Sequence, residues 1–92
     1  MNNRAHENRK IRLTELNETL LKDVDKVYDI WKNSENEEVK EYFSQVLFTL
    51  NKLLYELNID LENNIYTDEM IEKSEEISDF LKQIFDDLNE EE

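Results

Sequence analysis

The chain contains neither glycine nor proline, and this absence limits the turns that its backbone can make. Glycine normally supplies turns with a positive φ and proline fixes φ, so here the turns must use Asn, Asp or Ser. Such a composition favours helices joined by short, Asn-rich corners. The 92 residues are enough for one domain with a single hydrophobic core.

Apolar residues recur three and four positions apart in three segments, which predicts three amphipathic helices. The predicted helices cover about residues 9–32, 35–57 and 68–89. The second has the widest apolar face, so we expect it to contact two neighbours. The third carries one small polar residue, Ser74, within its apolar seam.

The corners between these helices carry capping residues. Asn33 is a helix stop, and Ser34 with Glu37 has the spacing of a capping box that opens the second helix. Thr67 is placed to be the N-cap of the third helix. The apolar residues within 58–66 suggest that this connection folds back over the open end of the core.

This pattern predicts an all-α protein, a small three-helix up-down-up bundle with the second helix in the centre. The alternative is a helical hairpin that a second copy completes, so that the bundle forms as a homodimer.

Charge is distributed unevenly along the chain, whose formal net charge is −13. The last 35 residues hold 13 acids and two lysines, whereas the first 33 residues are close to neutral. A basic head, formed by Arg4, Arg9, Lys10 and Arg12, precedes this acidic part. In an up-down-up bundle the head and the acidic tail lie at opposite ends. Either the head therefore pairs with the tail of another copy, or residues 1–8 and the last three residues are disordered.

A helical projection of residues 68–89 places a row of acids on the side away from the apolar seam. This acidic stripe consists of Asp68, Glu72, Glu75, Asp79, Asp86 and Glu90. At 1.5 Å per residue it would extend roughly 33 Å. It is a solvated face that keeps the protein soluble, a row of carboxylates that replaces phosphates in a basic groove, or a contact for another kind of basic partner.

Two aromatic residues of the second helix, Phe48 and Tyr55, lie seven positions apart and almost opposite its core face. An exposed aromatic pair is typical of a contact with another protein or a second copy. The alternative is that the protein's own helices enclose the second helix on both sides.

The sequence offers no catalytic, metal-binding or cofactor-binding signature. It has no Cys, its only histidine is His6, and phosphate-binding loops need the glycine that it lacks. We therefore expect a protein that is not an enzyme and needs no cofactor. Its negative charge also disfavours direct binding to nucleic acid or to anionic membranes.

Protein binding is the remaining class of function. We expect a non-enzymatic inhibitor or regulator that engages the basic surface of a nucleic-acid-binding protein, in the manner of a DNA mimic. The alternative is a homodimeric adaptor, an antitoxin-like partner or an immunity-type bundle whose acidity serves solubility alone. Small acidic helical proteins of phages and mobile elements, including some anti-CRISPR and anti-restriction factors, are similar in composition, though not in any motif. The absence of an apolar leader predicts a soluble cytoplasmic protein, located in the host cytoplasm if it is phage encoded.

Overall fold

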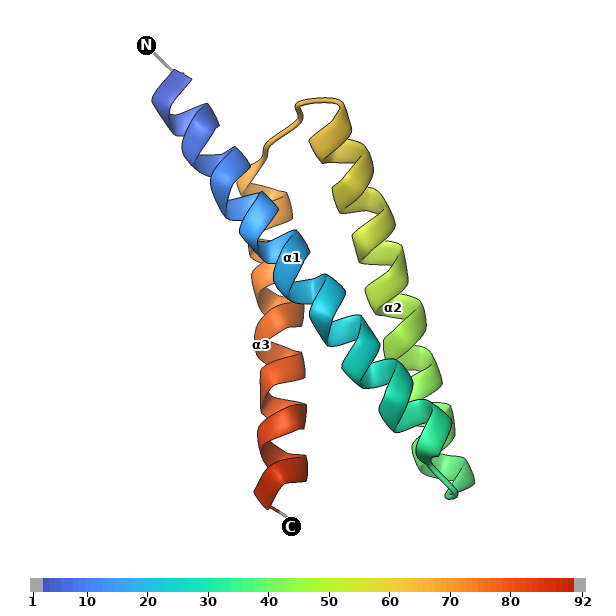
Figure 1. Cartoon of the computed structure of the whole chain (residues 1–92). Helices are drawn as coiled ribbons and strands as arrows, with labels where there is room; N and C mark the ends of the chain where they lie inside the picture. The colour runs from blue at the N-terminus through green and yellow to red at the C-terminus, as the bar shows by residue number, and fades with distance from the viewer. Residues whose placement is uncertain (1–2, 91–92) are drawn as a thin grey trace.

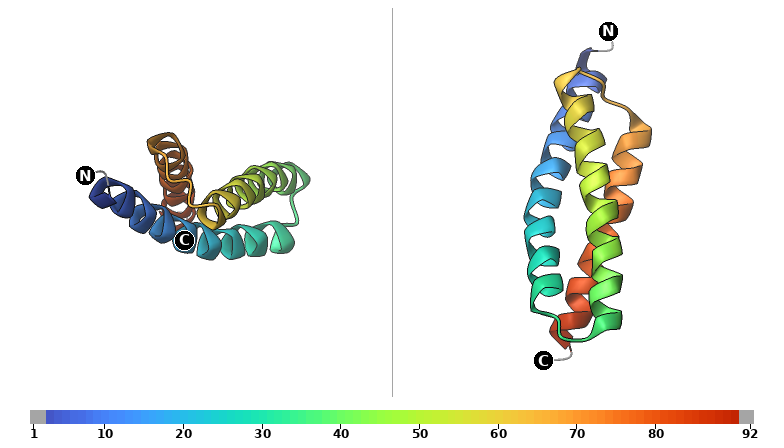
Figure 2. Two further views of the ribbon diagram at one scale, coloured as in Figure 1. Left: turned by 90° about the horizontal axis from the view of Figure 1, so that it is seen from above. Right: turned by 90° about the vertical axis from the view of Figure 1, so that its right-hand side faces the viewer.

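The computed structural model describes residues 3–90, and this part of the chain forms three α-helices. They are α1 (Asn3–Asn33), α2 (Glu37–Glu62) and α3 (Asp68–Glu90). Each helix runs antiparallel to the one before it, as Figures 1 and 2 show, and the molecule measures 54 × 24 × 17 Å. The predicted all-α, three-helix up-down-up bundle is confirmed.

The central helix is α1, because it packs against both of the others while α2 and α3 touch each other very little. Figure 1 shows α1 crossing α3 and meeting α2 at the corner that joins them, and it shows α2 and α3 closer together near their connection than at their other ends. The prediction that the second helix is central is therefore wrong. The wide apolar face of α2 packs on α1, so it needs no second neighbour.

The hydrophobic core lies where α1 meets its two partners. Leu13, Leu20 and Val27 of α1 are completely buried, and so are Leu50 and Leu57 of α2. These residues repeat at the predicted helical spacing. Removing a side chain of this kind from water stabilises a fold by about 1.5–3 kcal/mol, so the seam of α1 holds the bundle together.

The contribution of α3 to the core includes one polar residue. Leu81 and Ser74 are both completely buried. The Ser74 hydroxyl has no hydrogen-bond partner within residues 3–90. A small side chain allows two helices to approach closely, but a buried hydroxyl without a partner costs about 1–3 kcal/mol.

The first corner begins as predicted and continues differently. α1 ends at Asn33, but the N-cap of α2 is Asn36, whose side chain accepts hydrogen bonds from the backbone N–H groups of Glu38 and Val39 at 2.9 and 3.1 Å. The predicted capping box of Ser34 and Glu37 is therefore wrong. Asn caps a helix as well as Ser does, and this start places two acids in the first turn, where the helix dipole favours them.

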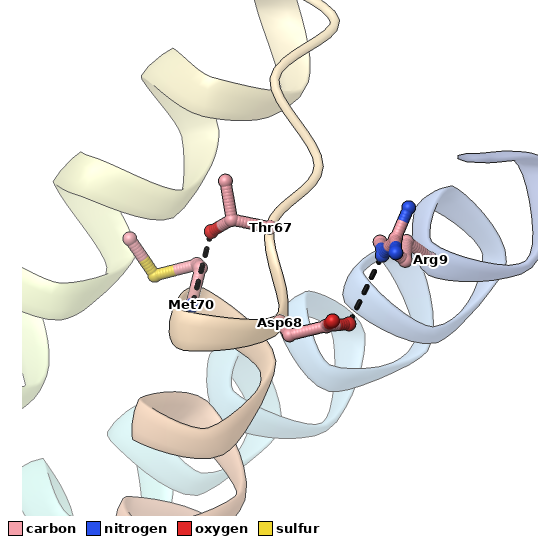
Figure 3. A network of polar contacts seen from close by, with 4 residues as sticks. All are labelled: Arg9, Thr67, Asp68 and Met70. Atoms are coloured by element: carbon pink, nitrogen blue, oxygen red, sulfur yellow. Dashed lines mark hydrogen bonds and ion pairs between the residues drawn. The ribbon is translucent and has the colours of Figure 1, made fainter. Parts of the chain in front are cut away.

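The second connection is shorter than predicted, because α2 continues to Glu62. Asn64 adopts a left-handed φ of 58°, which Asn tolerates better than most residues. Tyr66 is buried in the core and its hydroxyl donates to the Asn64 side chain at 2.8 Å. The Thr67 hydroxyl accepts a hydrogen bond from the Met70 N–H at 3.1 Å (Figure 3), which confirms the predicted N-cap of the third helix.

The start of α1 is part of the fold. The prediction began this helix at about Arg9, whereas the structure begins it at Asn3. The His6 ring lies 4.5 Å from the Tyr66 ring, between ring centres. Residues 3–8 are therefore helical rather than disordered. The first two and the last two residues lie outside the described range.

We predict that Ser74→Ala stabilises the protein by about 1 kcal/mol, because it removes a buried hydroxyl that has no partner. Chemical denaturation followed by circular dichroism would measure this gain. Ser44→Ala is the matched control, since Ser44 is exposed within α2 and its replacement changes only helix propensity. Equal gains from the two variants would contradict the prediction.

Candidate functional site

The candidate site is the acidic stripe, which lies along α3. Asp68, Glu72, Asp79 and Asp86 are exposed and Glu75 is half-buried. The last member, Glu90, is the final residue of α3, and its side chain lies outside the described part of the chain. The structure thus places the stripe on one continuous helix of 23 residues.

Two acids of the stripe pair with arginines of α1. The Arg9 side chain donates to Asp68 at 3.0 Å, as Figure 3 shows, and Arg12 donates twice to Glu75, at 2.7 and 3.2 Å. All four side chains are at least one-third exposed. Ion pairs in such positions contribute about 0–1 kcal/mol each.

These pairs change the expectation for the basic head. α1 and α3 run in the same direction, so the start of α1 lies beside the start of α3. Arg9 and Arg12 therefore neutralise the first part of the stripe within one molecule. The basic head thus meets acids of its own chain, which lie at the start of the third helix and not at its far end.

The rest of the stripe has no counter-charge of this kind. Glu72, Asp79 and Asp86 form no ion pair within residues 3–90. Lys73 contacts Glu56 of α2 at 3.0 Å. The lysines near Asp79 and Asp86 are Lys26 and Lys82, which line the same groove as these acids without forming an ion pair within residues 3–90. The outward side of α3 beyond its first turns is therefore strongly anionic.

A polar groove between α1 and α3 borders the stripe. Its charged lining consists of Asp23, Lys26, Asp79, Lys82 and Asp86. Burial raises the pKa of the Asp23 carboxyl, and the nearby Lys26 partly offsets this effect. The sequence prediction did not include Asp23 in the site. Its position three residues after Leu20 and four before Val27, on the apolar face of α1, is the signal that could have found it.

The aromatic pair of α2 projects into solvent. Phe48 and Tyr55 are 71% and 70% exposed, more than any other large apolar residue within residues 3–90. α2 is therefore not enclosed on both sides, because α3 packs on α1 instead of crossing the outer face of α2. The role of the two rings in a contact stays a prediction.

Comparison of the chain with protein-family models, with curated proteins and with solved structures gave no match. Among the described residues, no helix has a long enough apolar stretch to cross a membrane. Residues 3–90 also bring no three His, Asp or Glu side chains close enough to hold a metal ion.

We predict that Asp23→Asn stabilises the protein at pH 7, because the carboxylate is then charged and its burial is unfavourable. The pKa is higher in the folded than in the unfolded state, so this penalty is relieved as the pH falls through the folded value. The gain should therefore vanish below about pH 3.8, where both states are protonated. Denaturation at several pH values would measure it.

The control for this experiment is Asp25→Asn, which removes the same charge from an exposed position of α1. It corrects for the general relief of repulsion in an acidic chain. The prediction fails if the stabilisation by Asp23→Asn at neutral pH does not exceed that of the control.

Proposed function

We propose that this protein is a non-enzymatic inhibitor or regulator that binds the basic surface of a nucleic-acid-binding protein. The acidic side of α3 is the binding surface in this proposal. The observation that carries it is that Glu72, Asp79 and Asp86 are exposed and without ion-pair partners within residues 3–90.

The geometry of these acids supports a linear contact. Glu72, Asp79 and Asp86 are seven residues apart, which is about 10 Å along the helix axis for each step. Glu69 and Glu76 are exposed beside them. A straight row of carboxylates on a regular helix can enter a basic groove that otherwise receives the phosphates of a nucleic acid.

The electrostatics of the chain support the same choice of partner. Like charges at neighbouring helix positions repel by a few tenths of a kcal/mol per pair, so helix stability does not explain the row. A net charge of −13 attracts a basic protein over a long range and repels nucleic acid. Such attraction mainly speeds association, and it weakens as salt is added.

The proposal assigns no catalytic role and no cofactor. The one histidine, His6, packs against the Tyr66 ring at an interplanar angle of 51°. We assign no residue as nucleophile or general base.

A second class of function rests on the aromatic pair. The exposure of Phe48 and Tyr55 favours a homodimeric adaptor, an antitoxin-like partner or an immunity-type bundle. In that case the acidity of α3 serves solubility. Sedimentation of the wild type and of a variant with Phe48→Ser and Tyr55→Ser tests the homodimeric version of this class, since a self-contact through these rings would make the variant lighter and an unchanged mass would remove it.

We predict that the wild-type protein displaces specific proteins of a bacterial lysate from DNA-cellulose at low salt, and does so poorly at high salt. A variant with Glu72→Lys, Asp79→Lys and Asp86→Lys should lose this effect, because the row of carboxylates is reversed. The displaced proteins would be measured by gel electrophoresis and mass spectrometry.

The matched control carries Glu7→Lys, Glu18→Lys and Asp25→Lys, which reverse three exposed acids of α1 and change the net charge equally. This control should still displace the same proteins. The proposal is abandoned if no protein is displaced, if both variants behave alike, or if salt has no effect. Circular dichroism would verify that both variants remain helical.

A further inference from the structure

α2 carries a second row of residues on the side opposite the core. We name this row the outer seam: Glu41, Phe48, Lys52, Tyr55, Ile59 and Glu62. Successive members are seven, four, three, four and three positions apart along the chain. Every member is exposed. Gln45 fills the remaining position of the pattern and donates to Glu41 at 3.4 Å.

The spacing of the outer seam is that of a coiled-coil interface. Alternating steps of three and four give a period of 3.5 residues, which lets a second helix follow the row for several turns. The centre of the seam also borders an apolar groove, because Phe48 and Lys52 line it together with Leu53 and with Ile77 of α3. A helix on the seam can therefore insert a side chain toward α3.

The charges of the seam argue against a second copy of the chain that pairs with it over its full length. In an antiparallel pair centred on Lys52, this lysine faces its own copy and Glu41 faces Glu62. In a parallel pair in register, each charge faces itself. Two chains that each carry a charge of −13 add further repulsion.

The same charges are complementary to a helix of a different sequence. Lys52 forms no ion pair within residues 3–90, whereas Lys73 on the other side of the groove is paired with Glu56. We propose that the outer seam binds an amphipathic helix of another protein. That helix has apolar residues opposite Phe48, Tyr55 and Ile59, an acid opposite Lys52, and bases near both ends.

This inference goes beyond the acidic surface of α3. The outer seam lies on a different helix and selects an acid at the centre of its partner, whereas the stripe selects bases. The two surfaces can therefore be tested separately.

The test uses two designed helical peptides with Leu at the three positions that face Phe48, Tyr55 and Ile59, and Lys at both ends. One has Glu at the position that faces Lys52, and the other has Lys there. The full-length protein should bind the Glu peptide about three- to tenfold more tightly, as expected for an exposed ion pair replaced by repulsion. Fluorescence anisotropy of labelled peptides measures both affinities.

Variants of the protein show whether the peptides bind at the outer seam. Lys52→Glu should reverse the preference between the two peptides. Phe48→Ser with Tyr55→Ser should abolish binding of both. The triple lysine variant of α3, with Glu72→Lys, Asp79→Lys and Asp86→Lys, should keep the preference for the Glu peptide, which separates this site from the proposed function.

Three outcomes would overturn the inference. In the first, neither peptide binds the wild type better than it binds the Phe48→Ser, Tyr55→Ser variant. In the second, Lys52→Glu leaves the preference unchanged. In the third, sedimentation shows a dimer that this aromatic variant loses, because a second copy then occupies the seam.

Discussion

The packing of α1 against two partners is the contact on which the rest of the structure depends. Its seam of Leu13, Leu20 and Val27 is completely buried, and α2 and α3 attach to this helix far more than to each other. A helix that serves as the common support leaves the outer sides of its two partners uncovered. The exposed aromatic residues of α2 and the exposed acids of α3 both result from this arrangement.

The direction of the helices decides where charge is neutralised. α1 and α3 are parallel, so the arginines near the start of α1 reach the first acids of α3, at Asp68 and Glu75. Beyond that region α1 supplies no arginine, and Glu72, Asp79 and Asp86 form no ion pair within residues 3–90. The anionic field is therefore concentrated on the outer side of α3, where a basic partner would meet it first.

The two uncovered surfaces differ in their chemistry. The acidic side of α3 offers long-range attraction and little apolar area. The outer seam of α2 offers two large aromatic rings and a single lysine between them, a combination suited to short-range recognition of a helix. A protein with both surfaces could attract one partner by charge and hold a second by shape, or engage two regions of one partner.

The sequence by itself determined the features that depend on neighbouring residues. These are the three helices, the stop at Asn33, the cap at Thr67 and the exposure of Phe48 and Tyr55, since helical periodicity and capping act over a few positions. Predicting the acidic stripe also required only a helical projection. The tertiary structure alone decided that α1 is central, that Arg9 and Arg12 meet the stripe, and that Asp23 is partly buried beside it. Those outcomes depend on the total surface that distant segments bury against one another. The apolar faces of three helices do not by themselves show which helix packs against the other two.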